Sequence, residues 1–226
     1  MIAGWWVVVA SAQPMTTNGY TFSPNRAVPD GNPTGLALAT NLSGMTDFIA
    51  NVTVSLNISG GFNGDLYAYL TGPTGGFAVL LNRVGVANGN ANGYDDTGLN
   101  ITLNDAAGFN NVHFYQDDTY NLNGGGQLTG NWSSDGRAVD PLSAPTVIGT
   151  NSPTALLDSF DGISPDGTWT LFVADLSNGE QSTVVTWGLT IVTVPEPATW
   201  ALLGTGAALF LALRNWRVHF TARGSK

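Results

Sequence analysis

Five aspartates stand beside glycine-rich turns or at the ends of strand-like segments, where carboxylates from different loops could meet. They are Asp65, Asp95, Asp96, Asp105 and Asp175. A Ca²⁺ ion takes about six to eight oxygen ligands, so a site would need several of these carboxylates together with backbone carbonyls. These residues are therefore candidates for a calcium site. The alternative is that each aspartate bonds backbone amides in its own turn.

Three aromatic residues, Tyr115, Tyr120 and Trp132, lie in a long stretch rich in Asn, Gly and Asp that runs from Asp105 to Asp158. The stretch is too aromatic for a disordered linker, and we expect ordered loops at one end of the fold, where binding surfaces usually lie. Exposed rings there could stack on sugar rings, which would indicate a carbohydrate ligand. The same rings could instead fill the interior of the loop region.

No catalytic constellation emerges from the sequence. The two histidines are His113 and His219, and no nucleophile block accompanies them, so a Ser-His-Asp site cannot be assembled. The pairs Asp95-Asp96 and Asp117-Asp118 place neighbouring carboxylates in different directions, which does not suit acid–base catalysis. We expect a non-enzymatic protein with no catalytic residues, and no cofactor other than the candidate calcium ion.

Composition restricts the fold and the partners. The chain has 226 residues, with 29 Gly, 11 Pro and no Cys, which suits one domain of about 180 residues with end segments. Abundant Gly, Thr, Val and Trp predict an all-β sandwich or barrel. Four of the seven basic residues lie beyond position 200, so residues 1–213 carry three basic and sixteen acidic side chains, a net charge of −13. Such a body repels nucleic acid.

The segment from Gly167 to Thr193 contains the strongest strand signal. Alternate positions in each arm are apolar, including Trp169 in the first arm and Trp187 in the second, and this period of two is typical of half-buried strands. Ser177-Asn178-Gly179 offers residues that tolerate a reversal. The pattern predicts a β-hairpin with both tryptophans on buried faces.

Earlier segments predict further strands. Asn51 to Ile58 alternates apolar and polar residues, and glycine-rich turns separate it from Asp65 to Leu70 and from Phe77 to Leu81. Tight turns between three strands indicate a meander. Residues 13–35 show no period and predict an extended arm or loop.

The chain resembles the P domain (Homo B domain) of proprotein convertases over about Pro29 to Val192. The blocks that carry the resemblance, in order, are Asn51–Ile58, Gly64–Leu66, Leu70–Gly75, Asp105–Ala107, Phe160–Gly162, Gly167–Leu171, Asp175 and Thr186–Ile191. The resemblance implies a jelly-roll β-sandwich for residues 13–193. It also implies a non-catalytic module of the kind that packs on a subtilisin-like protease.

The start of the chain suggests export. Ile2 to Ala10 is apolar, and Ala10-Ser11-Ala12 matches the small-x-small pattern of a signal-peptide cleavage site. No Lys or Arg precedes the run. We therefore expect residues 1–12 to be a signal peptide, truncated at its start, with an apolar first strand as the alternative.

The end of the chain has three parts. Val194-Pro195-Glu196-Pro197 breaks the last strand, because proline cannot donate to a β-ladder. Residues 198–213 are uncharged, and Arg214 and Arg217 follow. Sixteen helical residues span about 24 Å against a hydrocarbon core of roughly 30 Å, so this stretch predicts a short transmembrane helix extended by snorkelling ends.

The three parts of residues 194–226 together resemble the PEP-CTERM sorting signal of Gram-negative bacteria that contain an exosortase. The resemblance implies that Val194, Pro195, Glu196 and Pro197 form the exosortase recognition element and that Arg214 and Arg217 form the cytoplasmic stop. Nine residues follow Arg217, which departs from the usual short end. The alternative is an ordinary single-pass anchor.

The leading hypothesis is an exported, non-enzymatic protein, anchored in the inner membrane as a precursor and then sorted to the cell surface or extracellular matrix. Its sandwich would bind or display, with extracellular polysaccharide or a protein as partner. The alternative is an accessory module that binds carbohydrate or a protease and sits on an ordinary anchor.

Overall fold

The computed structural model describes residues 14–195, 206–207 and 210. Contacts divide the chain into two units, Met1–Val194 and Pro195–Lys226. The predicted signal peptide at 1–12 lies outside the described residues, as do most of the residues predicted for the sorting tail and its helix. Among the described residues, no helix has the length and apolar character needed to cross a membrane.

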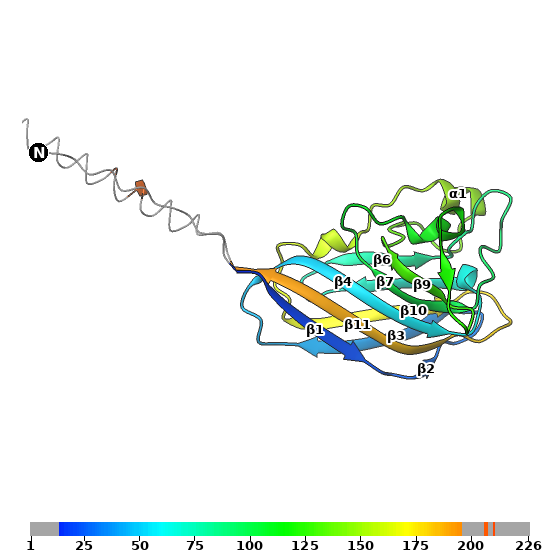
Figure 1. Cartoon of the computed structure of the whole chain (residues 1–226), viewed down its shortest axis with the longest axis horizontal. Coiled ribbons are helices and arrows are strands. Elements are labelled where there is room, and N and C mark those ends of the chain that lie inside the picture. Colours follow the sequence, from blue (N-terminus) through cyan, green and yellow to red (C-terminus); the bar gives the residue numbers. More distant parts are fainter. Residues whose placement is uncertain (1–13, 196–205, 208–209, 211–226) are drawn as a thin grey trace, which may run out of the picture. The chain divides into compact units, whose positions relative to one another are not determined.

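Two β-sheets form the first unit and face each other across one core (Figure 1). The larger sheet contains β1 (Thr16–Phe22), β2 (Arg26–Ala27), β4 (Phe48–Ser59), β7 (Gly98–Leu103), β8 (Asn121–Leu122), β9 (Leu128–Trp132) and β11 (Thr183–Val194). The smaller sheet contains β3 (Asn32–Leu42), β5 (Leu66–Thr71), β6 (Phe77–Asn82) and β10 (Gly167–Asp175). The predicted all-β sandwich is confirmed.

The order of strands in the larger sheet is β1-β11-β4-β7-β9-β8, with β2 also pairing with β11. The order in the smaller sheet is β3-β10-β5-β6. Neighbouring strands are antiparallel except β7 and β9, which run parallel. β9 and β8 therefore form the edge of the larger sheet farthest from β1.

Alternation along the strands sets the core, as the sequence predicts. The residues expected to point inward are at most 2% exposed, and they are Val54, Leu56, Leu171, Val173, Trp187 and Leu189. The residues expected to point outward all retain exposure, and they are Thr53, Ser55, Thr170 and Thr186. Trp187 lies on β11 between β1 and β4, and its ring centroid is 4.6 Å from that of Phe22.

The predicted hairpin from Gly167 to Thr193 is wrong, although both of its arms are strands. β10 pairs with β3 and β5, whereas β11 pairs with β1, β2 and β4. The segment with Ser177 to Gly179 therefore carries the chain from one sheet to the other. An alternating pattern shows only which face of a strand is buried. Two strands that lie in opposite sheets and cover one core have the same pattern as the two strands of a hairpin.

The predicted meander is correct only in its second half. β5 and β6 pair as a hairpin, but β4 belongs to the opposite sheet. The glycine-rich turn before Asp65 contains the short 3-10 helix η1 (Asn63–Asp65), and it crosses between the sheets. The arm predicted for residues 13–35 is also wrong, because β1, β2 and the start of β3 lie within it.

Residues 105–158 are ordered, as predicted, but they are not loops alone. They contain the 3-10 helix η2 (Val112–Asp117), β8, β9, the short helix α1 (Pro145–Thr150) and the start of the 3-10 helix η3 (Leu157–Phe160). The sequence pattern does not predict β9, because its sequence, Leu-Thr-Gly-Asn-Trp, includes Gly and Asn, which are depleted in strands.

Replacing Trp187 with Ala should destabilise the sandwich by about 3–5 kcal/mol, because the ring is 2% exposed and its loss leaves a cavity between the sheets. Chemical unfolding of the chain measures this free energy. Leu142→Ala serves as the control, since Leu142 is 63% exposed, and its effect should stay within about 0.5 kcal/mol. Equal effects of the two substitutions would contradict the assignment of Trp187 to the core.

Candidate functional site

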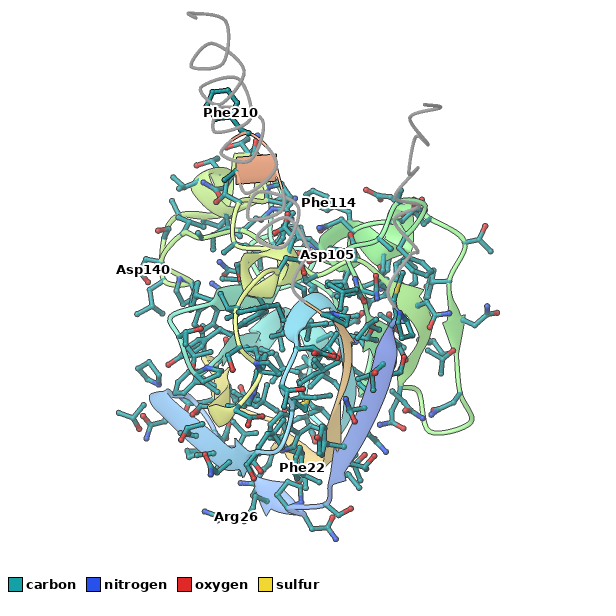
Figure 2. The ribbon with its side chains drawn as sticks, turned by 90° about the vertical axis from the view of Figure 1, so that its left-hand side faces the viewer. Phe22, Arg26, Asp105, Phe114, Asp140 and Phe210 are labelled. Carbon is teal, nitrogen blue, oxygen red and sulfur yellow. The ribbon has the colours of Figure 1, made fainter. Side chains whose placement is uncertain are left out.

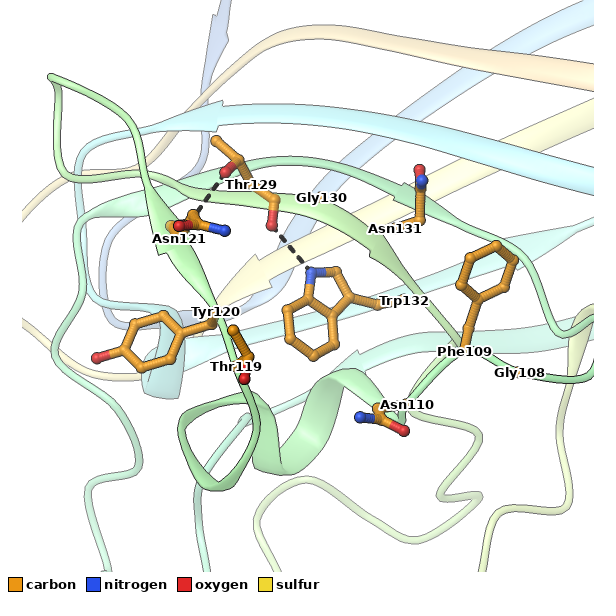
Figure 3. A pocket seen from close by; sticks show the side chains of 10 residues that line it. All are labelled: Gly108, Phe109, Asn110, Thr119, Tyr120, Asn121, Thr129, Gly130, Asn131 and Trp132. Atoms are coloured by element: carbon orange, nitrogen blue, oxygen red, sulfur yellow. Dashed lines mark hydrogen bonds between the residues drawn. The ribbon is translucent and has the colours of Figure 1, made fainter.

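An open pocket of about 210 Å³ lies at the β8–β9 edge of the larger sheet (Figure 3). Three chain segments supply its walls: the loop before η2, the segment entering β8, and β9. The lining residues are Gly108, Phe109, Asn110, Thr119, Tyr120, Asn121, Thr129, Gly130, Asn131 and Trp132. All ten are uncharged at neutral pH, although the chain carries sixteen acidic residues.

Aromatic rings define the shape of the pocket. In the view of Figure 3, the indole of Trp132 lies between Phe109 on one side and Tyr120 on the other. Trp132 is 5% exposed, whereas Phe109 is 40% and Tyr120 is 36% exposed. The indole N–H of Trp132 donates to the carbonyl oxygen of Thr129 at 3.1 Å, which fixes the orientation of the ring. Trp132 thus forms a rigid floor, and the two exposed rings form the walls.

Carboxamides supply most of the polar groups of the pocket. Asn110, Asn121 and Asn131 are all exposed. Asn110 accepts a hydrogen bond from the Ser133 amide, and Asn121 accepts one from the Thr129 hydroxyl, in both cases through the backbone carbonyl. Among the described residues none of these three side-chain amides has a hydrogen-bond partner, and each amide offers both donors and an acceptor.

Of the three aromatic residues predicted as ligand contacts, only Tyr120 is well exposed. Tyr115 is 0% exposed, so the prediction that it could stack on a ligand is wrong. Its hydroxyl donates to Asp96 Oδ2 at 2.7 Å and accepts from Asn63 Nδ2 at 3.2 Å. Burial raises the pKa of Tyr115 far above its usual value. Tyr115 therefore supports the pocket from behind, packing against Trp132 with ring centroids 6.1 Å apart.

A buried carboxylate, Asp135, anchors the chain that follows β9. Its Oδ2 atom lies 2.7 Å from His113 Nδ1 and accepts from the backbone N–H of Asn82 at 3.0 Å. Its Oδ1 atom accepts from Arg137 Nη1 at 3.2 Å. Asp135, His113 and Asn82 are 0% exposed, and Arg137 is 5% exposed. The cluster ties β6 and η2 to the segment after β9.

His113 therefore has a structural position. Its Nε2 atom lies 3.1 Å from the carbonyl oxygen of Val86, so both ring nitrogens have protein partners. The ring also packs edge-on against Phe114, over which the guanidinium of Arg137 lies at 5.1 Å. This environment leaves no side of the imidazole open to a substrate.

Asp105 makes a second junction, at the same end of the sandwich as Phe114 and away from Phe22 (Figure 2). It accepts hydrogen bonds from the amide and hydroxyl of Ser134 at 2.7 and 2.8 Å and from the amide of Leu157. The carboxylate thereby joins the end of β7 to η3 and to the segment after β9.

The five aspartates proposed as calcium ligands are divided among separate places. Asp96 bonds Tyr115 and Gln116, Asp105 bonds Ser134 and Leu157, and Asp95 is exposed. Asp65 and Asp175 are neighbours, since the Asp65 carbonyl accepts from Leu176 N–H. Within the part of the chain that the structure describes, no three His, Cys, Asp or Glu side chains gather as metal ligands would. We therefore propose no calcium site from this set.

Sequence reasoning identified Tyr120 and Trp132 but missed Phe109 and the three asparagines of the pocket. Asn131 stands next to Trp132 in the sequence, and Phe109 precedes Asn110. Such pairs of aromatic and amide residues are a signal that could have suggested a polar, aromatic pocket. Which pairs meet depends on the parallel pairing of β7 with β9, which sequence patterns do not specify.

Comparison with protein-family models identifies one match, over residues 193–217. The chain carries a PEP-CTERM protein-sorting motif. This motif indicates an exported protein that an exosortase processes. Of the residues that the sequence resemblance assigned to the motif, Val194 and Pro195 are described. Val194 ends β11, so the motif begins as the last strand of the sandwich ends.

Similar solved structures include the serine protease of Aeromonas sobria, alone and in complex with its chaperone. The complex gives a TM-score of 0.44 at 15% identity, and the protease alone gives 0.43 at 14%. Each match covers 82% of this chain and 28% of the protease chain. No curated protein sequence matches the chain.

The substitution Asp175→Asn should change how stability depends on pH. Burial raises the pKa of Asp175, Asp65 nearby raises it further, and the hydroxyl of Ser182, which donates to Oδ2 at 3.0 Å, lowers it. The folded state therefore binds this proton more tightly than the unfolded state, so ionisation of Asp175 lowers stability as pH rises.

Asparagine at position 175 does not ionise, so the variant does not lose stability in this way as pH rises. The thermal midpoint of the Asn variant, relative to the natural protein, should rise between the ordinary aspartate pKa of about 3.9 and neutral pH. Asp95→Asn, at an exposed position, controls for the change in net charge. A difference in midpoint that stays constant or shrinks as pH rises would contradict the buried, uncompensated position of this carboxylate.

Proposed function

We propose that the chain is a non-enzymatic protein of the cell envelope or extracellular matrix whose β-sandwich serves binding or display. The observation that carries this proposal is the sorting motif at 193–217, which begins within the last two residues of β11. On this proposal Pro195, Glu196 and Pro197 are read by an exosortase. Arg214 and Arg217 hold the precursor in the inner membrane until processing sends the sandwich to the surface.

The strand order supports a display role. Thr16 pairs with Thr193, so β1 begins and β11 ends at the same end of the larger sheet. β4 and β7 lie between β11 and β9, which places the pocket strand three strand spacings, about 14 Å, from the strand that leads into the motif. The pocket and the strand that leads to the tail thus occupy different parts of the sheet.

Two features support a non-enzymatic role. The one histidine in the described part of the chain, His113, is buried with both nitrogens occupied. The pocket is lined by uncharged residues, of which Tyr120 alone has a titratable side chain. General acid–base catalysis needs a positioned group that titrates near the working pH. The resemblance to P domains, which are non-catalytic modules, points the same way.

The alternative role, an accessory module that binds carbohydrate, is favoured by one observation. Exposed rings and free carboxamides meet in the pocket of Figure 3. This alternative is compatible with sorting through the motif and differs from the main proposal only in naming carbohydrate as what the sandwich binds.

Replacing Pro195, Glu196 and Pro197 together with alanine should block processing without preventing insertion of the tail into the membrane, because the uncharged stretch at 198–213 is unchanged. An uncleaved form should accumulate in the inner membrane of a host that contains an exosortase. Cell fractionation followed by immunoblotting measures its size and location.

The matched control replaces Pro33 and Glu180 with alanine. Both are exposed in the sandwich, and Glu180 is the other glutamate of the chain. This control should mature as the natural protein does. If the triple-alanine variant also matures and reaches the surface at the natural rate, the proposed sorting role of the motif is wrong.

A further inference from the structure

We propose that the pocket lined by Phe109, Tyr120, Trp132 and three asparagines binds one ring of a neutral saccharide. The inference names the class of ligand for the binding role proposed above. It rests on that proposal in one respect, which is that it treats the sandwich as a binding module. It does not depend on whether an exosortase processes the tail.

The aromatic residues match the apolar face of a sugar ring. Such a ring carries C–H groups on its faces and hydroxyls around its rim, so it packs flat against an aromatic side chain. Phe109 and Tyr120 are 40% and 36% exposed on either side of the Trp132 floor, and both line the same open pocket. Rings that are already ordered lose little side-chain entropy when a ligand packs on them.

The asparagines match the rim of hydroxyls. A hydroxyl both donates and accepts, and a carboxamide does the same, so the two groups pair in either direction. Asn110, Asn121 and Asn131 reach the pocket from three different segments of the chain. Thr119 adds a hydroxyl to the lining. This arrangement can bond several hydroxyls of one ring at the same time.

Charge and size restrict the ligand further. The lining is uncharged and belongs to a body with a net charge of −13, so a uronic or sulfated sugar would be repelled without any compensating contact. The volume of about 210 Å³ is below the roughly 300 Å³ at which pockets begin to enclose drug-sized ligands. One ring fits, and because the pocket is open its neighbours in a longer glycan can extend outward.

The pocket is preorganised. The Ser133 amide donates to the Asn110 carbonyl at 2.8 Å, and the Val112 amide donates to the Ser133 carbonyl at 3.1 Å, so the two walls are joined behind the floor. Gly130 has a φ of +107°, which disfavours any side chain, and a Cβ there would lie 3.5 Å from the indole nitrogen of Trp132. Glycine at this position therefore suits a backbone conformation that other residues rarely adopt, next to the Trp132 ring.

Binding of the full chain to immobilised oligosaccharides tests the inference, in a detergent without a sugar headgroup. The probes are neutral oligomers of glucose, galactose, mannose and N-acetylglucosamine, together with uronic-acid oligomers. At least one neutral series should bind with a Kd of about 1 mM, and the uronic-acid series should not. The double variant Phe109→Ala/Tyr120→Ala should weaken binding about tenfold, and so should the single variant Asn131→Ala.

The control is Phe62→Ala, because Phe62 is 38% exposed but lies outside the pocket. It should bind as the natural protein does, and the thermal midpoint of each variant checks that its fold is retained. The inference is overturned if no neutral series binds, if uronic-acid oligomers bind more tightly, or if the pocket variants bind unchanged. Each of these results leaves the sorting proposal standing, because the alanine replacement of the motif tests that separately.

Discussion

The buried carboxylate of Asp135 is the constraint on which the irregular half of the sandwich depends. A carboxylate in the interior costs several kcal/mol unless charged and hydrogen-bonding partners surround it. His113 is one such partner, because its Nδ1 atom lies 2.7 Å from Asp135 Oδ2 while its Nε2 atom is held by the Val86 carbonyl at 3.1 Å. Arg137 supplies a cation, with its Nη1 atom 3.2 Å from Asp135 Oδ1.

The pocket follows from this constraint. The segment after β9 must turn inward at Asp135, and this turn brings Ser133 against Asn110 and Val112. Those backbone hydrogen bonds set the distance between the loop that carries Phe109 and the strand that carries Trp132. A buried charge cluster thus determines the geometry of an exposed, uncharged pocket. Elsewhere in the larger sheet, β11 leads into the sorting motif. The pocket and the strand that leads into the sorting motif are separate parts of the same sheet.

The sequence predicts which face of a strand is buried better than it predicts which strands pair with each other. Alternation correctly placed Val54 and Trp187 in the core, because burial is a local property of a strand. It paired β10 with β11 wrongly, because partners are chosen by contacts between residues far apart in the chain. Leu128–Trp132 gave no strand signal, and the sequence left open whether Tyr115 lies at the surface or fills the interior, where the structure places it. The motif after Val194 was predictable because its meaning lies in the order of residues and not in the fold.

Native-state hydrogen exchange of the full chain, with and without Asp135→Asn, tests most directly whether the buried cluster holds the pocket. The amides of Val112 and Ser133 lie behind the pocket, whereas those of Val54 and Leu189 lie in the central strands. If the account is correct, exchange at Val112 and Ser133 accelerates much more than exchange at Val54 and Leu189, because the loop region opens locally. Equal acceleration at all four amides, or none at Val112 and Ser133, would contradict it.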